Sequence, residues 1–304
     1  MNVVKLSSDM SISEAIRSAE RGTRFILAPG TYREKIEITV PDIEIVGDIA
    51  GETKIVWDDY ATKPDEKGVE YNTFRTYTVA VLAPRVTFRN ITVENDALYP
   101  EIKGQEVALT VCADGFRAYN CRFISTQDTV FCGPLPSDLI IRYYGFLKST
   151  LRAGGTMRQI FRDCFIAGNV DFIFGCATAL FDRCEIHSVY DVRGHGFTAA
   201  PAHGYEQKVG FVFNECIFTC EDKVPDGSVY LARPWRDHGK CTFIDCTYGR
   251  HIAAAGFDSW NDSGRDKTAR FAEYGRIPSD RVPWSTVIGD DEMRQLLKAF
   301  DQEV

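Results

Sequence analysis

The chain has 304 residues, of which 44% are hydrophobic and 26% are charged, the proportions of a globular protein with a sizeable core. Its formal charge of −8, without any basic run, argues against a nucleic-acid-binding protein. No stretch has the length of a membrane-spanning helix, so no membrane association is expected.

The first predicted element lies near the N-terminus. Residues 11–22 carry a capping-box pattern from Ser11 to Glu14 and end at Gly22, which predicts a short helix. No apolar signal segment precedes it, so we expect a cytoplasmic protein, and a secreted protein whose signal was removed is the alternative. A second helix is predicted near the C-terminus, at 291–300.

A short cysteine-containing pattern recurs five times between these helices. Each copy has a polar residue, a cysteine, any residue and a large apolar residue. The copies lie at 120–123, 163–166, 183–186, 215–218 and 245–248. Successive cysteines are 43, 20, 32 and 30 residues apart, which fits a coil of about twenty residues with loops added. Related segments without cysteine lie at 43–47 and 86–95.

This repeat predicts an all-β fold, a parallel β-solenoid that forms a single domain over residues 1–304. A β-sandwich is the alternative, but its hairpin turns of Asn-Gly or Asp-Gly type are mostly missing. The ten cysteines are expected to be buried free thiols, with a few disulfides as the alternative. Cys216 with Cys220 and Cys241 with Cys246 are spaced like zinc ligands, yet they include repeat core positions, so no metal or other cofactor is expected.

Two aspartates occupy the same phase of the repeat. Asp128 follows Cys121 by seven residues, and Asp171 follows Cys164 by seven. An inserted loop around 132–157 fills the rest of the interval, which predicts that the aspartates lie on neighbouring coils, with strands about 4.8 Å apart. Two such carboxylates cannot both ionise cheaply, so one holds a proton while the other stays charged.

An ion-paired or solvated ladder explains the same spacing, and from spacing alone the two readings stand level. Asp191 also follows Cys184 by seven residues, but it lies in D-V-R-G-H-G, which is typical of an exposed loop. Asp171 differs from it because its neighbours, Val170 and Phe172–Phe174, favour a buried strand, where a charged carboxylate is costly.

Three segments resemble the signatures of the pectin methylesterase family. They are Q-D-T-V-F at 127–131, G-N-V-D-F-I-F-G at 168–175 and Y-L-A-R-P-W at 230–235. Supporting matches lie at 30–34, 105–109 and 272–275, in the family's order. The resemblance implies a right-handed parallel β-helix that hydrolyses methyl esters of galacturonate to carboxylate and methanol. Its expected partner is methyl-esterified homogalacturonan or its oligogalacturonides, bound by a monomer.

Carried over position by position, the resemblance also implies roles for the site residues. Asp171 would be the nucleophile, with Arg233 beside it to lower its pKa, and Asp128 the general acid and base. Gln127 would stabilise the transition state, with Gln105 close to it. The residues expected to bind substrate or to line its cleft are Arg233, Trp235, Thr73, Phe174, Phe131 and Trp260. For Trp260, packing in the core is the alternative.

Departures from the family's pattern concern the substrate cleft. Val130 and Phe131 stand where Leu and Tyr are common, Ala232 where Gly is usual, and Ala200 where Gln is common. These changes bear on which sugar units are preferred. They leave the expected reaction unchanged.

Other functions remain open at this point. A lyase on the same fold would need calcium ligands and a basic residue, and a glycosidase would need two carboxylates flanking the bond. A non-catalytic carbohydrate-binding solenoid predicts that Asp171 is dispensable. A serine esterase is disfavoured because no G-x-S-x-G segment occurs.

Overall fold

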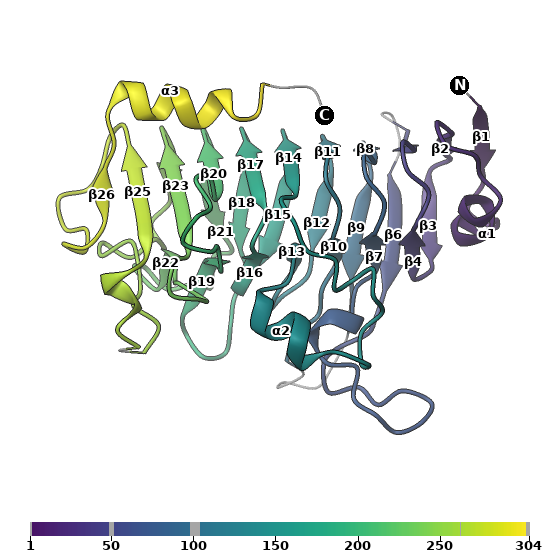
Figure 1. Cartoon of the computed structure of the whole chain (residues 1–304), viewed down its shortest axis with the longest axis horizontal. Coiled ribbons are helices and arrows are strands. Elements are labelled where there is room, and N and C mark those ends of the chain that lie inside the picture. The colour runs from purple at the N-terminus through teal and green to yellow at the C-terminus, as the bar shows by residue number, and fades with distance from the viewer. Residues whose placement is uncertain (1, 49–51, 98–103, 262, 302–304) are drawn as a thin grey trace.

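The computed structural model describes residues 2–48, 52–97, 104–261 and 263–301, which wind into a right-handed parallel β-helix (Figure 1). Three parallel sheets, here called A, B and C, run along the helix, and a typical coil contributes one strand to each. The predicted solenoid is confirmed. The β-sandwich alternative is wrong, because the paired strands are parallel and join different coils.

Sheet A contains, in spatial order, β1 (Val3–Leu6), β2 (Arg24–Leu27), β5 (Glu44–Val46), β8 (Thr87–Arg89), β11 (Phe116–Tyr119), β14 (Arg158–Arg162), β17 (Thr178–Asp182), β20 (Phe211–Asn214), β23 (Lys240–Ile244), β25 (Arg270–Tyr274) and β26 (Thr286–Val287). Sheet B contains β3 (Gly30–Arg33), β6 (Thr53–Trp57), β9 (Thr92–Asn95), β12 (Arg122–Ile124), β15 (Phe165–Gly168), β18 (Glu185–Ser188), β21 (Ile217–Cys220) and β24 (Thr247–Tyr248). Sheet C contains β4 (Ile36–Ile38), β7 (Val79–Val81), β10 (Leu109–Val111), β13 (Val130–Cys132), β16 (Val170–Gly175), β19 (Gly196–Pro201) and β22 (Val229–Ala232).

The cysteine repeat forms the corner between sheets A and B. From β8 to β24 each passage from a sheet A strand to the following sheet B strand takes two residues. The first is polar and has a positive φ, as at Asn120 (50°) and Asp163 (53°), a region that Asn and Asp tolerate better than most residues. The second is Ile91 at the first of these corners and a cysteine at the others, and from Cys164 onward its thiol donates to a carbonyl of the preceding coil, as Cys184 does to Phe161 at 3.4 Å.

The core is a column of like side chains. Phe161, Phe181, Phe213 and Phe243 occupy matching positions of neighbouring sheet A strands, with ring centroids 4.7 to 4.9 Å apart. All four are fully buried. Stacked aromatic pairs add to the free energy gained from burial, so the repeat stabilises the register of the coils.

The ten cysteines are free in the structure, and eight of them are buried. This agrees with the expected buried thiols. A disulfide framework is absent.

Helices cover one end and one flank of the β-helix (Figure 1). Helix α1 (Ile12–Arg17) buries Ile12 and Ile16 in the core at the N-terminal end. It stops short of the predicted Gly22, and Glu34, which directly follows β3, accepts from the backbone N–H groups of Ile12 and Ser13. Helix α3 (Asp290–Lys298) confirms the predicted C-terminal helix and packs across strands of sheet A.

The connection from β13 to β14 occupies residues 133–157 and contains helix α2 (Ser137–Arg142), which the sequence did not predict. Short 3₁₀ helices η1 (Thr73–Arg75) and η2 (Arg265–Lys267) lie in two other connections. None of the helices described is long and apolar enough to cross a membrane.

Candidate active site

Asp128 and Asp171 lie on neighbouring coils, at the same end of sheet C, where β13 and β16 begin, as their spacing predicted. Strand β13 pairs with β16 so that Val130 lies opposite Ile173, an offset of 43 residues that also relates the two aspartates. The backbone N–H of Asp128 donates to the carbonyl of Val170 at 3.0 Å. Both aspartates have positive φ, 65° and 51°, outside the corner repeat. Strained backbone of this kind is common at functional sites.

The local sequence of β16 places Asp171 on the outer face. The register with β19 shifts between Val170 and Ile173, and such a bulge re-aims side chains. Phe172 then points into the core and is fully buried. Gly168 is required for this path, because a Cβ there would lie 2.2 Å from the Cβ of Phe172.

Arg233 forms a two-pronged ion pair with Asp171. Its Nε and Nη2 donate to the two carboxylate oxygens at 2.7 and 2.6 Å. The guanidinium is stacked between two rings, 3.7 Å from the centre of Phe197 and 4.0 Å from that of Trp260. Trp260 therefore contacts the arginine, which neither of its two predicted roles described. This clamp fixes the direction of both carboxylate oxygens.

The pKa values of the two aspartates differ in degree. Burial raises the pKa of Asp128 well above its usual range, and the negative charge of Asp171 raises it further. Burial also raises the pKa of Asp171, while the hydrogen bonds and charge of Arg233 offset part of that effect. Arg233 lowers the pKa of Asp171, as expected, but burial raises it by more, so the net shift is upward. The rise is larger for Asp128, which therefore has the greater tendency of the two to hold a proton.

Gln127 lies next to these carboxylates and contacts a residue that sequence analysis missed. Its Oε1 accepts from Nη2 of Arg193 at 3.4 Å, and its side chain offsets part of the rise in the pKa of Asp128. Arg193 is held by Asp191, whose side chain is only 7% exposed. Asp191 lies in an exposed loop, as predicted, and its side chain is the covered part of it. The sequence offered one signal for Arg193, which is its position directly before Gly194 in the loop that follows a repeat strand.

Gln105 lies on the coil before Gln127. The N–H of the following residue, Glu106, donates to the carbonyl of Gln127 at 3.0 Å, so the two glutamine segments are adjacent. The carbonyl of Gln105 accepts from Ala61 at 2.9 Å, which ties it to the connection that carries Thr73. The structure thus brings both predicted amide side chains to the same end of sheet C.

Aromatic side chains form one wall beside the carboxylates. Phe131 lies between Phe74 and Phe174, with ring centroids 5.1 and 5.0 Å away. Phe131 and Phe174 are only 1% and 2% exposed, so they support the wall from behind and offer no free face to a ligand. Trp235 is half-buried, meets Phe174 edge-on at 5.8 Å and has the guanidinium of Arg236 over its ring at 4.8 Å.

Thr73 begins η1, and its neighbour Phe74 enters the same aromatic cluster. Leucines of the 133–157 connection pack behind these rings: Leu135, Leu139, Leu147 and Leu151. The connection therefore buttresses the wall.

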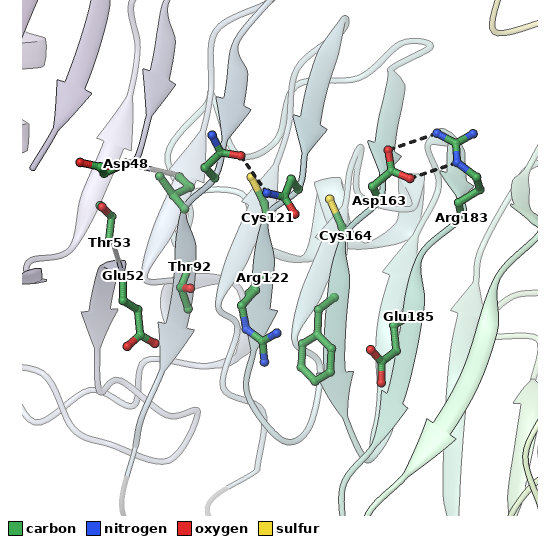
Figure 2. Close-up of a pocket in the computed structure, with 14 residues that line it drawn as sticks. Asp48, Glu52, Thr53, Thr92, Cys121, Arg122, Asp163, Cys164, Arg183 and Glu185 are labelled. Atoms are coloured by element: carbon green, nitrogen blue, oxygen red, sulfur yellow. Dashed lines mark hydrogen bonds and ion pairs between the residues drawn. The ribbon is translucent and has the colours of Figure 1, made fainter. Parts of the chain in front are cut away.

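A separate hollow of about 430 Å³ lies on another face of the β-helix, along the corner between sheets A and B (Figure 2). Its lining includes Asn120, Asp163 and Arg183, and none of the predicted site residues. Within the described residues, no group of three or more His, Cys, Asp and Glu side chains could hold a metal ion.

The arrangement brings four chemical functions together at one end of sheet C. A clamped carboxylate can attack an electrophilic carbon, and a second carboxyl can give and take a proton. Amide donors can stabilise a developing oxyanion. A flat ring can carry a sugar.

Comparison with known proteins identifies relatives over nearly the whole chain. The family model for Pectinesterase matches residues 6–134 and 147–296, leaving out 135–146, which include all of α2. Pectinesterase 31 of Arabidopsis thaliana is 32% identical over 95% of this chain and 89% of its own length. Pectin methylesterase from Yersinia enterocolitica superposes with a TM-score of 0.79 at 25% identity, covering 97% of this chain and 99% of that one. A pectin methylesterase in complex with a hexasaccharide superposes with a TM-score of 0.77 at 25% identity, covering 97% and 94%.

Proposed function

Because this chain belongs to the pectinesterase family and is therefore a carboxylic ester hydrolase, we propose that it cleaves methyl esters of galacturonate through an acyl-enzyme on Asp171. The observation that carries the proposal is the pair of carboxylates on adjacent coils, one clamped by Arg233 and the other inclined to hold a proton. A charged acyl acceptor and a proton donor are both required to expel methoxide, a poor leaving group.

The first half-reaction begins with attack by an Asp171 oxygen on the ester carbon. The carbonyl electrons move to oxygen, and the resulting oxyanion accepts hydrogen bonds from the amide groups of Gln127 and Gln105. One such donor is worth about 3 kcal/mol of transition-state stabilisation. As the tetrahedral intermediate collapses, protonated Asp128 transfers its proton to the departing methoxide, and methanol leaves.

The second half-reaction reverses the roles of the proton donor. Asp128 is now ionised and takes a proton from the water that attacks the acyl-enzyme. Collapse of the second tetrahedral intermediate breaks the bond to Asp171 and frees galacturonic acid, which loses its proton to solvent and becomes the carboxylate. Asp128 again holds a proton, so the site is ready for another ester. No metal step enters this sequence.

The proposed substrate is methyl-esterified homogalacturonan or one of its oligosaccharides. The half-buried ring of Trp235 suits a sugar ring, and a pectin methylesterase of the same fold binds a hexasaccharide. That the protein is a monomer and does not act at a membrane stays a prediction. So does a cytoplasmic location, to which the relatives add no support.

Methanol release from a defined methylated trigalacturonate, with EDTA present, tests the proposal. We expect release by the wild-type chain, no new reducing ends as from a glycosidase, and no ultraviolet-absorbing product as from a lyase. Asp171→Asn should lower turnover by several orders of magnitude. Acid quenching followed by peptide mass spectrometry should find the galacturonyl adduct on the peptide containing Asp171. Undiminished methanol release by Asp171→Asn would contradict the assignment.

A further inference from the structure

Arg193 occupies a fixed position in the connection from β18 to β19. Asp191 holds it by accepting from its backbone N–H at 2.8 Å, its Nε at 2.8 Å and its Nη2 at 2.7 Å. The Asp191 carboxylate is nearly buried, whereas the Arg193 side chain is half-exposed. A buried carboxylate needs its partner. The ion pair with Asp191 therefore restricts the Arg193 guanidinium to one position.

The guanidinium meets Gln127 on the oxygen side of its carboxamide. Nη2 of Arg193 lies 3.4 Å from Oε1 of Gln127. A guanidinium has donors and no acceptor, so it can pair only with the oxygen of the amide. The contact with Arg193 therefore selects one orientation of the amide, with its oxygen towards Arg193 and its NH₂ group turned away from the guanidinium.

We propose that Arg193, held by Asp191, is a positioning residue that keeps the NH₂ group of Gln127 facing the reacting ester. A glutamine amide has two orientations related by a half-turn, and only one of them donates to an oxyanion. In the opposite orientation the amide oxygen would face the developing negative charge and repel it. Arg193 thus acts on the reaction through Gln127. This inference rests on the proposed function and adds to it a residue that the signature segments do not contain.

The charge of Arg193 offers a competing explanation, because it also acts on the aspartates. Burial raises the pKa of both Asp128 and Asp171, and the charge of Arg193 offsets a small part of each shift. Direct binding of a substrate carboxylate by the half-exposed guanidinium is a second explanation. Both of these effects would persist with any side chain at position 127. The positioning role, in contrast, requires Gln127.

A double-mutant cycle separates these roles. The variants are Arg193→Ala, Gln127→Ala and the double variant, and the readout is methanol release with kcat and KM determined separately. Arg193→Ala should lower kcat about tenfold to a hundredfold, a part of the loss caused by removing the donor itself. In the Gln127→Ala background, the same change should alter kcat less than twofold. KM should change little in both backgrounds.

Other results would overturn the proposal. Equal losses of kcat in both backgrounds would show that Arg193 acts independently of Gln127, and a shift of the pH profile in both would identify its charge as the cause. A rise in KM with kcat unchanged would make Arg193 a substrate-binding residue.

Arg183→Ala is the matched control. Arg183 is 46% exposed, against 47% for Arg193, and is paired to Asp163 through two hydrogen bonds at the corner between sheets A and B (Figure 2). Its removal deletes an equivalent ion pair away from Gln127, and kcat should stay within twofold of wild type. A wild-type chain that releases no methanol would contradict the proposed function itself, whereas release with an additive cycle would contradict the role of Arg193 alone.

Discussion

The guanidinium carbon of Arg233 lies 4.0 Å from the centre of the Trp260 ring, on the side opposite Phe197. Trp260 thereby acts on the proposed nucleophile without touching it, because Arg233 in turn holds both oxygens of Asp171.

Trp260→Ala should lower kcat/KM about tenfold, since a cation–π contact of this kind contributes roughly 1 kcal/mol and its loss lets the guanidinium move. Trp260→Phe keeps an aromatic face and should retain most of the activity. Methanol release by the two variants, with thermal melting to check the fold, measures the effect. Equal activity of Trp260→Ala and wild type would show that Phe197 alone suffices to hold Arg233.

The dependence of kcat/KM on pH should be bell-shaped. Asp171 must be ionised to attack, and because burial raises its pKa, activity should be lost on acidification at a pH above the usual aspartate value of about 3.9. Asp128 must be protonated to release methanol. Its pKa is raised well above the usual range, so activity should fall as the pH rises past the raised pKa of Asp128. The two limbs belong to the coupled pair.

Asp128→Asn tests the assignment of the alkaline limb. This variant has no proton to lose at position 128, so its residual methanol release should no longer decline as the pH rises. An alkaline limb at the same pH as in wild type would assign that limb to another group.

Phe131→Ala should destabilise the fold. Phe131 is fully enclosed by Phe74, Phe174 and the 133–157 connection, and truncating a buried phenylalanine costs about 3–5 kcal/mol. Urea unfolding followed by circular dichroism measures the loss. Tyr144→Ala, at a ring that is 80% exposed in the same connection, is the control and should change stability by less than about 0.5 kcal/mol. A similar small change for Phe131→Ala would mean that the wall is loosely packed.

Most thiols should be unreactive in the folded protein. Burial raises the pKa of Cys112 and of Cys176 to about 12, and it also raises the pKa of the four buried corner cysteines, Cys121, Cys164, Cys184 and Cys216. A chromogenic disulfide reagent at pH 8 should therefore react only with the half-buried Cys220 and Cys246. In guanidinium, without reductant, ten thiols should react. Fewer than ten would reveal disulfides.

The sequence predicted those parts of the structure that depend on position within the repeat. The corner cysteines marked each coil, and equal distances from Cys121 and Cys164 placed Asp128 and Asp171 at one end of one sheet. Such inferences succeed because a parallel β-helix converts spacing along the chain into position across strands.

Properties that depend on three-dimensional surroundings were not predictable in this way. The effect of Arg233 on Asp171 was predicted, but the net rise in the pKa of Asp171 was not, because the cost of its burial depends on everything that encloses it. Phe131 was expected to contact substrate, yet α2 and its flanking leucines cover it. Arg193 was missed because its partner Gln127 lies 66 residues earlier and two coils away.

The constant two-residue passages between sheets A and B leave the chain only one side on which its length can vary. Between β8 and β24, every long connection among the described residues borders sheet C, where the carboxylates lie, so the scaffold separates what must stay regular from what can be exchanged. Grafting the 133–157 connection or the 189–195 segment from a relative should therefore redirect the choice of sugar units along the pectin chain while the coils beneath keep their pitch.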